Sequence, residues 1–376
     1  MTLIKYYLEK NFNPVPVKTN NKKLFYKHVN LRKNLIESHL KIPLNLLKDK
    51  NILEFGPNRG EHSMIYALNG GNLYFVEPIF EAVNQLKKNY KKYNLDKAIK
   101  NIQNKNLEKY NSKKKFDLVI AEGFLNTLPN RDKYLKKIFN LVSDSGLVII
   151  NYDDYFGSFV ELIKSAILKK ICIKKCLKLD SKESLKISKK LFYEDFKKLK
   201  NTRPFEAYWL DQLSCEFAID VWKFTDILNL ASKNNFYFYS SSPIWSKISH
   251  YNWYKNLNLN KKKYINQQIY KEWKENFSYF LTGKKNIKIE NKHEKNYQSF
   301  NILVKQVISF LKKDGKIRFK KIKTYENSFF KDINTIIDFL NDKKIKLNYK
   351  NLKTFRSFTG TNLHYVCLKK NEKNYK

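Results

Sequence analysis

An acidic residue and two glycines surround a single tight turn, and their spacing could hold a ligand that carries a positive centre. Glu54 lies in an apolar run, and Gly56, Asn58 and Gly60 follow at alternate positions. A dinucleotide fingerprint, G-x-G-x-x-G, would require glycine at positions 58 and 61, where the chain has Asn58 and Glu61. Glu61 at a helix start would also repel a pyrophosphate. The turn therefore disfavours NAD and FAD.

Two more acidic residues follow later apolar runs. Glu77 comes directly after the run 73–76, and Glu122 comes directly after the run 116–121. If these runs are parallel strands, their carboxyl ends lie at one edge of the sheet, which is where open α/β sheets bind ligands. We therefore expect Glu54, Glu77 and Glu122 at a common edge.

Candidate proton acceptors lie at the same edge. His62 follows the turn, and it either titrates near neutrality as a base or is a polar residue at the start of a helix. Glu122 either contacts a ligand or caps the next turn. Asp153 and Asp154 follow the run 146–150, but adjacent side chains in a strand point to opposite faces. We therefore take His62, Glu122 and Asp153 as catalytic candidates and predict no metal site.

Between residues 51 and 157, short apolar runs alternate with segments of helical period. This pattern is typical of a parallel sheet flanked by helices. Seven of the ten glycines fall between Gly56 and Gly157, where the backbone must therefore make its tightest turns. The predicted strands are 51–56, 73–76, 99–102, 116–121 and 146–150, and the predicted helices are 61–68, 79–91 and 135–142.

In these elements the chain resembles the class I S-adenosylmethionine-dependent methyltransferases. Their first motif is E/D-x-G-x-G-x-G, to which Glu54, Gly56 and Gly60 correspond. Asn58 departs from it, but asparagine tolerates left-handed backbone well, so we expect the turn to survive. Their second motif is an acid that ends the second strand and bonds both ribose hydroxyls, and Glu77 occupies that place.

The resemblance implies a Rossmann-like α/β fold with a seven-stranded, mostly parallel sheet and helical insertions. The sheet would close with a helix near 224–231, a strand at 236–242 and a terminal strand at 363–368. It also implies S-adenosylmethionine as the cofactor and an enzyme that transfers a methyl group. The cofactor-binding residues would be Glu54, Gly56, Asn58, Gly60, Glu77 and Glu122.

The segment 203–211 combines charged and aromatic residues in the least basic part of the chain. It either stacks on a sugar and bonds its hydroxyls, or forms a lid helix that packs Trp209 into the core. The candidate substrate-binding residues are Arg203, Glu206, Trp209 and Asp211, and the run 245–254 could line the same cleft. The chain is also loosely similar to bacterial methyltransferases, some of them associated with surface-polysaccharide genes, and this similarity does not fix a substrate.

The sequence after the fourth strand bears on the acceptor atom. Glu122-Gly-Phe-Leu125 lacks the N/D-P-P-Y/F motif with which methylases of exocyclic amines hold a planar nitrogen. We therefore expect methyl transfer to a hydroxyl of a small-molecule or saccharide acceptor.

The predicted domain organisation follows from these elements. We divide the chain into an N-terminal helical extension (1–50), the cofactor-binding core (51–157), a helical insertion or substrate lid (158–223), a helix and strand completing the sheet (224–243), a second helical insertion (244–350), and a terminal strand with its tail (351–376).

The net charge of +39 first suggests a nucleic acid partner. Only six of the 74 basic residues are arginine, however, and arginine is the better reader of phosphates and bases. Nucleic acid is therefore not the favoured partner. Two alternatives stay open: an RNA methyltransferase that docks through 251–376, and a non-enzymatic protein that lies on a membrane surface through a helix at 156–171.

The remaining composition predicts a reduced, cytoplasmic protein. The cysteines lack a CxxC spacing, so a structural zinc site or disulfide framework is not expected. No apolar run reaches the length of a membrane span. Lys5, Glu9 and Lys10 interrupt the first ten positions before an apolar run could form, so a signal peptide is not expected.

Overall fold

The computed structural model describes most of the chain. It covers residues 21–128, 130–199, 204–214, 221–244, 259–283, 293–313, 317–322, 328–342, 344–360 and 362–371, with Lys5, Leu8 and Glu9. The chain divides into two compact units, which we describe separately. The sheet unit comprises the described residues of Thr2–Tyr152, Lys223–Lys271 and His364–Lys376, and the helical unit those of Asp153–Trp222 and Glu272–Leu363.

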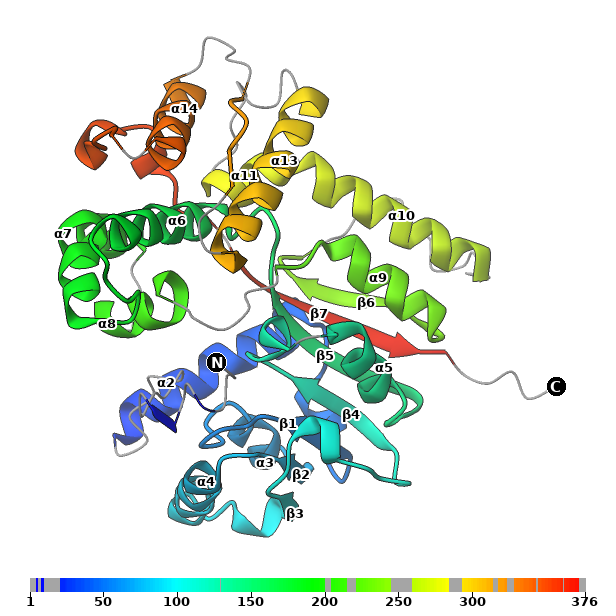
Figure 1. Ribbon diagram of the computed structural model, residues 1–376. Helices are drawn as coiled ribbons and strands as arrows, with labels where there is room; N and C mark the ends of the chain where they lie inside the picture. The colour runs from blue at the N-terminus through cyan, green and yellow to red at the C-terminus, as the bar shows by residue number, and fades with distance from the viewer. Residues whose placement is uncertain are drawn as a thin grey trace. The chain divides into compact units, whose positions relative to one another are not determined.

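The sheet has seven strands in the order β3-β2-β1-β4-β5-β7-β6 (Figure 1). Strands β1 to β5 pair in parallel, whereas β6 and β7 are antiparallel. The mostly parallel α/β fold and all seven predicted strands are thus confirmed. The strands are β1 (Asn51–Phe55), β2 (Asn72–Val76), β3 (Ile99–Gln103), β4 (Phe116–Ala121), β5 (Val142–Asp153), β6 (Phe236–Ser242) and β7 (Leu363–Lys370).

The central strands β1 and β4 are mostly apolar, as expected of a parallel sheet that helices cover on both faces. Ile52, Leu118 and Ile120 are buried in a core that also takes Leu86 and Tyr90 from a flanking helix. The helices of this unit are α2 (Lys22–Lys33), α3 (Met64–Leu68), α4 (Phe80–Lys92), α5 (Arg131–Phe139) and α9 (Phe224–Lys233). A π-helix (Asn34–His39) and a 3-10 helix (Leu44–Leu47) continue the chain after α2.

Two predicted boundaries differ from the structure. The helix predicted from residue 61 begins only at Met64, because residues 61–63 continue the turn of Gly60. Val142, which we assigned to a helix face, is instead the first residue of β5 and pairs with Phe116. The helix already ends at Phe139, and a left-handed residue, Ser145, then shifts the register of β5.

The helical unit is built around α6 (Phe159–Lys174). This helix is buried on nearly every side, and α7, α13, α14 and the π-helix Trp209–Leu213 pack against it. The hypothesis that this segment lies on a membrane is therefore wrong, because its apolar residues are buried in protein. The further helices are α7 (Lys182–Lys198), α8 (Phe205–Tyr208), α11 (Phe277–Thr282), α13 (His293–Lys312) and α14 (Ser328–Asn341), and α10 (Leu259–Glu275) crosses from one unit to the other.

None of the helices within the described ranges is long and apolar enough to span a membrane.

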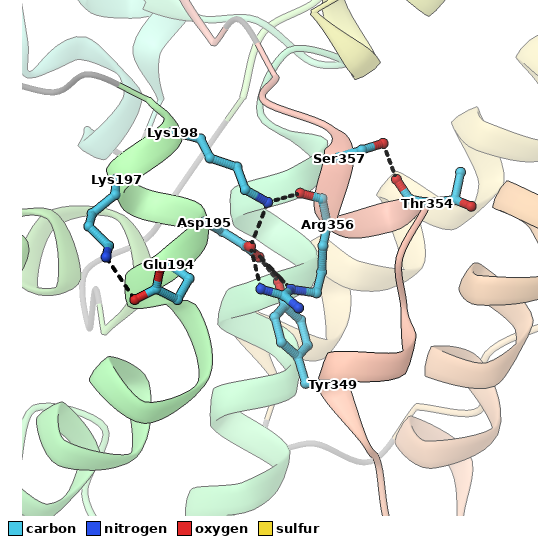
Figure 2. A network of polar contacts seen from close by, with 8 residues as sticks. All are labelled: Glu194, Asp195, Lys197, Lys198, Tyr349, Thr354, Arg356 and Ser357. Atoms are coloured by element: carbon cyan, nitrogen blue, oxygen red, sulfur yellow. Dashed lines mark hydrogen bonds and ion pairs between the residues drawn. The ribbon is translucent and has the colours of Figure 1, made fainter.

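A buried carboxylate fixes α7 to the last part of the helical unit (Figure 2). Asp195 is 3% exposed, and its Oδ2 accepts a hydrogen bond from the Tyr349 hydroxyl at 2.7 Å. Its Oδ1 lies 3.1 Å from both Nε and Nη2 of Arg356 and also accepts from Nζ of Lys198. Glu194, the preceding residue, pairs with Lys197 on the exposed side of the same helix.

We expect Asp195→Ala to destabilise the helical unit by about 3 kcal/mol, because it leaves the Arg356 charge without its partner. Glu194→Ala is the matched control, and its exposed ion pair should contribute less than about 1 kcal/mol. Urea unfolding with hydrogen exchange of the α7 amides measures both effects. Equal destabilisation by the two variants would contradict the assignment.

Candidate active site

The turn between β1 and α3 depends on three residues in left-handed backbone conformation. Gly56 has φ +67°, Asn58 has φ +51° and Gly60 has φ +78°. The prediction that Asn58 substitutes for a glycine in this turn is thus confirmed in conformation. A Cβ at Gly60 would lie 2.8 Å from Cε2 of Tyr90 and 2.9 Å from Cγ of Leu86. Position 60 therefore needs glycine for space as well as for its backbone angle.

Glu77 meets this turn, as its place at the end of β2 predicts. Its Oε2 accepts the Asn58 N–H at 2.8 Å, and its Oε1 accepts the Ile79 N–H at 2.9 Å. Burial raises the pKa of Glu77 to about 6, although the two backbone hydrogen bonds oppose that rise. Each carboxylate oxygen keeps acceptor capacity beyond its one backbone donor.

Glu54 lies on the next strand of the sheet and is 4% exposed. The Ser63 hydroxyl donates to its Oε2. Burial is the main cause that raises the pKa of Glu54 to about 8, and the charge of Glu122 adds to it, against the Ser63 hydrogen bond and the charge of Arg32. A cation bound beside Glu54 and Glu77 would favour the ionised form of both.

Glu122 directly follows β4 and forms a buried ion pair with Arg32 of α2. The contact is bidentate, with Nη1 donating to Oε2 at 3.0 Å and Nη2 donating to Oε1 at 2.7 Å. The two side chains are 6% and 8% exposed. The guanidinium binds both carboxylate oxygens, so the ion pair fixes the position of the Glu122 side chain. Our sequence analysis did not identify Arg32 as a site residue. Arginine is rare in this chain, and that rarity could have marked Arg32 as a candidate.

The surroundings of this pair are aromatic and polar. Burial raises the pKa values of the Tyr66 and Tyr365 hydroxyls, on which the charges of Arg32 and Glu122 also act. The N–H of Gly123 donates to Oδ1 of Asn151 at 2.6 Å. Gly123 has φ +82°, and a Cβ placed there would meet no atom within 4 Å. The carboxyl end of β4 therefore has open space next to the ion pair.

His62 contacts a second histidine. Its Nδ1 lies 3.2 Å from Nε2 of His28, which α2 contributes. Burial and then the Arg32 charge lower the pKa of His28 to about 4, and the same causes, with His28 itself, hold the pKa of His62 well below its usual range. The option that His62 titrates near neutrality is thus wrong, because the sequence did not reveal its burial beside Arg32. Both imidazoles are neutral at pH 7.

The other candidates belong to the helical unit or lie outside the described residues. Asp153 is the last residue of β5, and its carbonyl accepts the Trp222 N–H at 2.9 Å. Trp209 is 3% exposed, so the prediction that its ring stacks on a substrate conflicts with its packing in the helical unit. Glu206 lies in α8, and Asp211 in the π-helix that follows, where Gln212 donates to its Oδ2.

Arg203 and the run 245–254 are outside the described residues.

Asp154, the neighbour of Asp153, has a structural role. Its Oδ1 accepts the N–H groups of Phe156 and Gly157, and its Oδ2 accepts Nε1 of Trp273 at 2.7 Å. Across the described ranges, no cluster of three or more His, Cys, Asp or Glu side chains is arranged to hold a metal ion.

The strand order, the left-handed turn after β1 and the acid after β2 together define an α/β domain of the nucleoside-binding, Rossmann-like class. A family model described as "Methyltransferase domain" matches residues 26–207. None of the curated proteins matches the chain. Residues 26–207 therefore match a methyltransferase domain, which agrees with the methyltransferase class that the sequence resembles.

Several solved structures are similar to this chain. They include PKMT2 from Rickettsia typhi in complex with AdoHcy (16% identity over 56% of this chain and 44% of that one, TM-score 0.43). The N-methyltransferase NodS from Bradyrhizobium japonicum WM9 is 14% identical over 34% of this chain and 62% of that one, with a TM-score of 0.29. Coclaurine N-methyltransferase is 13% identical over 35% and 36%, with a TM-score of 0.30. The matches thus span between 36% and 62% of the length of these three structures.

The buried pair between α2 and β4 generates a prediction about stability. Arg32→Leu leaves the Glu122 carboxylate buried without a partner, and we expect it to destabilise the sheet unit by about 3–5 kcal/mol. Arg32→Lys should recover only part of this, because an ammonium cannot make the bidentate contact. Urea unfolding measures both variants. Lys33→Ala, which removes an exposed pair with Glu37, is the control, and an effect as large as that of Arg32→Leu would contradict the prediction.

Proposed function

We propose that this domain transfers the methyl group of S-adenosylmethionine to a hydroxyl of a small-molecule or saccharide acceptor. The observation that carries the cofactor half of this proposal is the contact of Glu77 with the turn. Its carboxylate is fixed by the N–H groups of Asn58 and Ile79, in the place where a ribose would present two hydroxyls.

The residues at this edge fit such a cofactor chemically. Gly56, Asn58 and Gly60 would let its methionine and ribose approach the backbone, and Glu77 would accept from the ribose hydroxyls. Glu54 would face its positive charge. The cofactor supplies an electrophilic methyl group bound to a sulfonium, so the protein's own tasks are to align the acceptor, to exclude water and to receive a proton.

The charge of the site also supports this ligand. The charges of Glu122 and Glu77 both act on Glu54, and Arg32 pairs with Glu122. A ligand with a phosphate would add to this negative charge, whereas S-adenosylmethionine carries a positive charge toward it. The raised pKa values of Glu54 and Glu77 fit this ligand, because a bound cation would favour the ionised forms of both carboxylates.

The acceptor is inferred from the residues after β4 and from the helical unit. Glu122-Gly-Phe-Leu125 lacks the motif for a planar amine, and in the structure the Arg32 guanidinium holds the Glu122 carboxylate. Glu206 and Asp211, with Arg203, remain our candidates for bonding the hydroxyls of an acceptor. Glu122 then acts as a fixed part of the cofactor site, and the proton goes elsewhere.

We expect Glu77→Ala to weaken S-adenosylmethionine binding by about 100-fold, because two hydrogen bonds to a charged group are lost. Titration calorimetry of the full chain measures this. Glu81→Ala, at an exposed position in the first turn of α4, should bind as the wild type does. Wild-type affinity in Glu77→Ala would refute the assignment.

The pKa of Glu77 also gives a pH dependence. Its carboxylate must be ionised to accept from two hydroxyls at once, so the affinity for S-adenosylmethionine should be highest well above pH 6 and fall as the pH decreases through about 6. Glu77→Gln cannot titrate, and it should lose this dependence. A wild-type affinity that stays constant between pH 5 and 7 would contradict the prediction.

The acceptor class is tested with labelled methyl groups. Purified protein and [methyl-³H]-S-adenosylmethionine are incubated with cell-envelope glycan, small-molecule and RNA fractions, with Glu77→Ala as the inactive control. We expect base-stable label in the glycan or small-molecule fraction. Label in RNA alone, lost steeply with added salt, would support the RNA alternative instead.

A further inference from the structure

Two histidines from distant parts of the sequence form a pair in the sheet unit. His62 lies two residues after Gly60, the last of the turn residues that we assign to the cofactor, and His28 lies on α2, one helical turn before Arg32. Residues four apart share one face of a helix, so the Arg32–Glu122 ion pair also fixes the face that carries His28. The turn therefore positions His62 and the ion pair positions His28, and Nδ1 of His62 lies 3.2 Å from Nε2 of His28.

The pair restricts how the protons are distributed. Two neutral imidazoles share one hydrogen bond only if one nitrogen donates and the other accepts. If Nδ1 of His62 donates to Nε2 of His28, then Nε2 of His62 carries a free electron pair. The hydrogen bond at one ring nitrogen thus sets the chemistry of the other. His62 is half-buried, so its ring is not sealed inside the protein.

Burial, and after it the charge of Arg32, keeps the pair neutral. Arg32 acts on both imidazoles, and His28 acts on His62. The Glu122 carboxylate binds Arg32 and so limits, without abolishing, this positive influence. With the burial of both rings, the result is an imidazole pair that is in the proton-accepting form throughout the physiological pH range.

We propose that His62 accepts the proton of the acceptor hydroxyl through Nε2, and that His28 is a positioning residue that fixes the required tautomer. This inference rests on the proposed function. As the hydroxyl oxygen bonds to the methyl carbon, the carbon–sulfur bond breaks and its electron pair stays on sulfur. The hydroxyl proton moves to Nε2 of His62, and the imidazolium so formed keeps its Nδ1–H bond to His28. A weak base suffices because the sulfonium methyl is a strong electrophile.

The tautomer is tested without knowledge of the acceptor. Full-length protein labelled with ¹⁵N-histidine is studied by long-range ¹H–¹⁵N NMR with S-adenosylhomocysteine present, and His28→Gln and His62→Gln assign the signals. We expect a protonated Nδ1 and an unprotonated Nε2 in His62 at pH 7. His28→Phe keeps a ring but removes the acceptor, so this preference should disappear. A proton on Nε2 of wild-type His62, or an unchanged tautomer in His28→Phe, would overturn the proposal.

Methyl transfer to the acceptor fraction then tests the role. We expect His62→Gln to lower kcat by about 10²–10⁴-fold with little change in the affinity for S-adenosylmethionine. His28→Phe should lower kcat at least about tenfold, whereas His28→Gln, whose amide oxygen can accept from Nδ1–H, should recover most of it. His39→Gln is the control, because His39 lies in the same N-terminal segment but contacts Ser242.

The outcomes separate this inference from the function on which it rests. If the wild-type protein did not bind S-adenosylmethionine, or if it labelled none of the fractions, the proposed function would be overturned. The NMR result would still decide whether the two histidines form the expected pair. Wild-type kcat in His62→Gln, with cofactor binding intact, would overturn the role of the histidine pair alone.

Discussion

The sheet unit has to keep three carboxylates in protein surroundings at one edge of its sheet. The charges of Glu122 and Glu77 both act on Glu54 there, and each of the three carboxylates is stabilised by a different means. Arg32 neutralises Glu122, backbone N–H groups bind Glu77, and burial favours the protonated form of Glu54. Burying an uncompensated charge is expensive, so these means determine where α2, the turn and the strand ends can lie.

This constraint explains why the cofactor site and the fold cannot be separated. The turn that would approach a ligand also supplies the Asn58 N–H that binds Glu77. Helix α2, which precedes the first strand in the sequence, supplies Arg32. A cationic ligand completes the charge of the edge. The unliganded site is therefore built with an excess of acid that S-adenosylmethionine suits and that a phosphate-bearing cofactor does not.

Much of the sheet could be predicted because its signals are local. Apolar runs, turn glycines and the acid after each strand lie close together in sequence, and the meeting of Glu77 with the turn followed from the topology of parallel strands. Arg32 and His28 could not be predicted in this way, since nothing local shows where α2 packs. The low pKa of His62 and the burial of Trp209 depend on the same kind of distant contact.

The rarity of arginine among the basic residues also indicates where particular side chains are needed. The chain has 74 basic residues, of which six are arginine, and two of these six make bidentate or forked contacts with buried carboxylates. Arg32 holds Glu122 in the sheet unit, and Arg356 holds Asp195 in the helical unit. In a chain that otherwise uses lysine, an arginine therefore indicates a position where planar geometry matters, because an ammonium cannot replace it there.

The strand order has a consequence for how the protein is made. β6 ends at Ser242, but its described partner β7 begins at Leu363, about 120 residues later, and β7 also stands between β5 and β6. During synthesis, β5 and β6 leave the ribosome long before the strand that joins them. Both therefore present unpaired edges while residues 272–362 of the helical unit are being made, and such edges invite pairing with other chains. The many lysines that emerge in this interval, in segments such as 259–283 and 293–313, give the unfinished chain a charge that opposes that association.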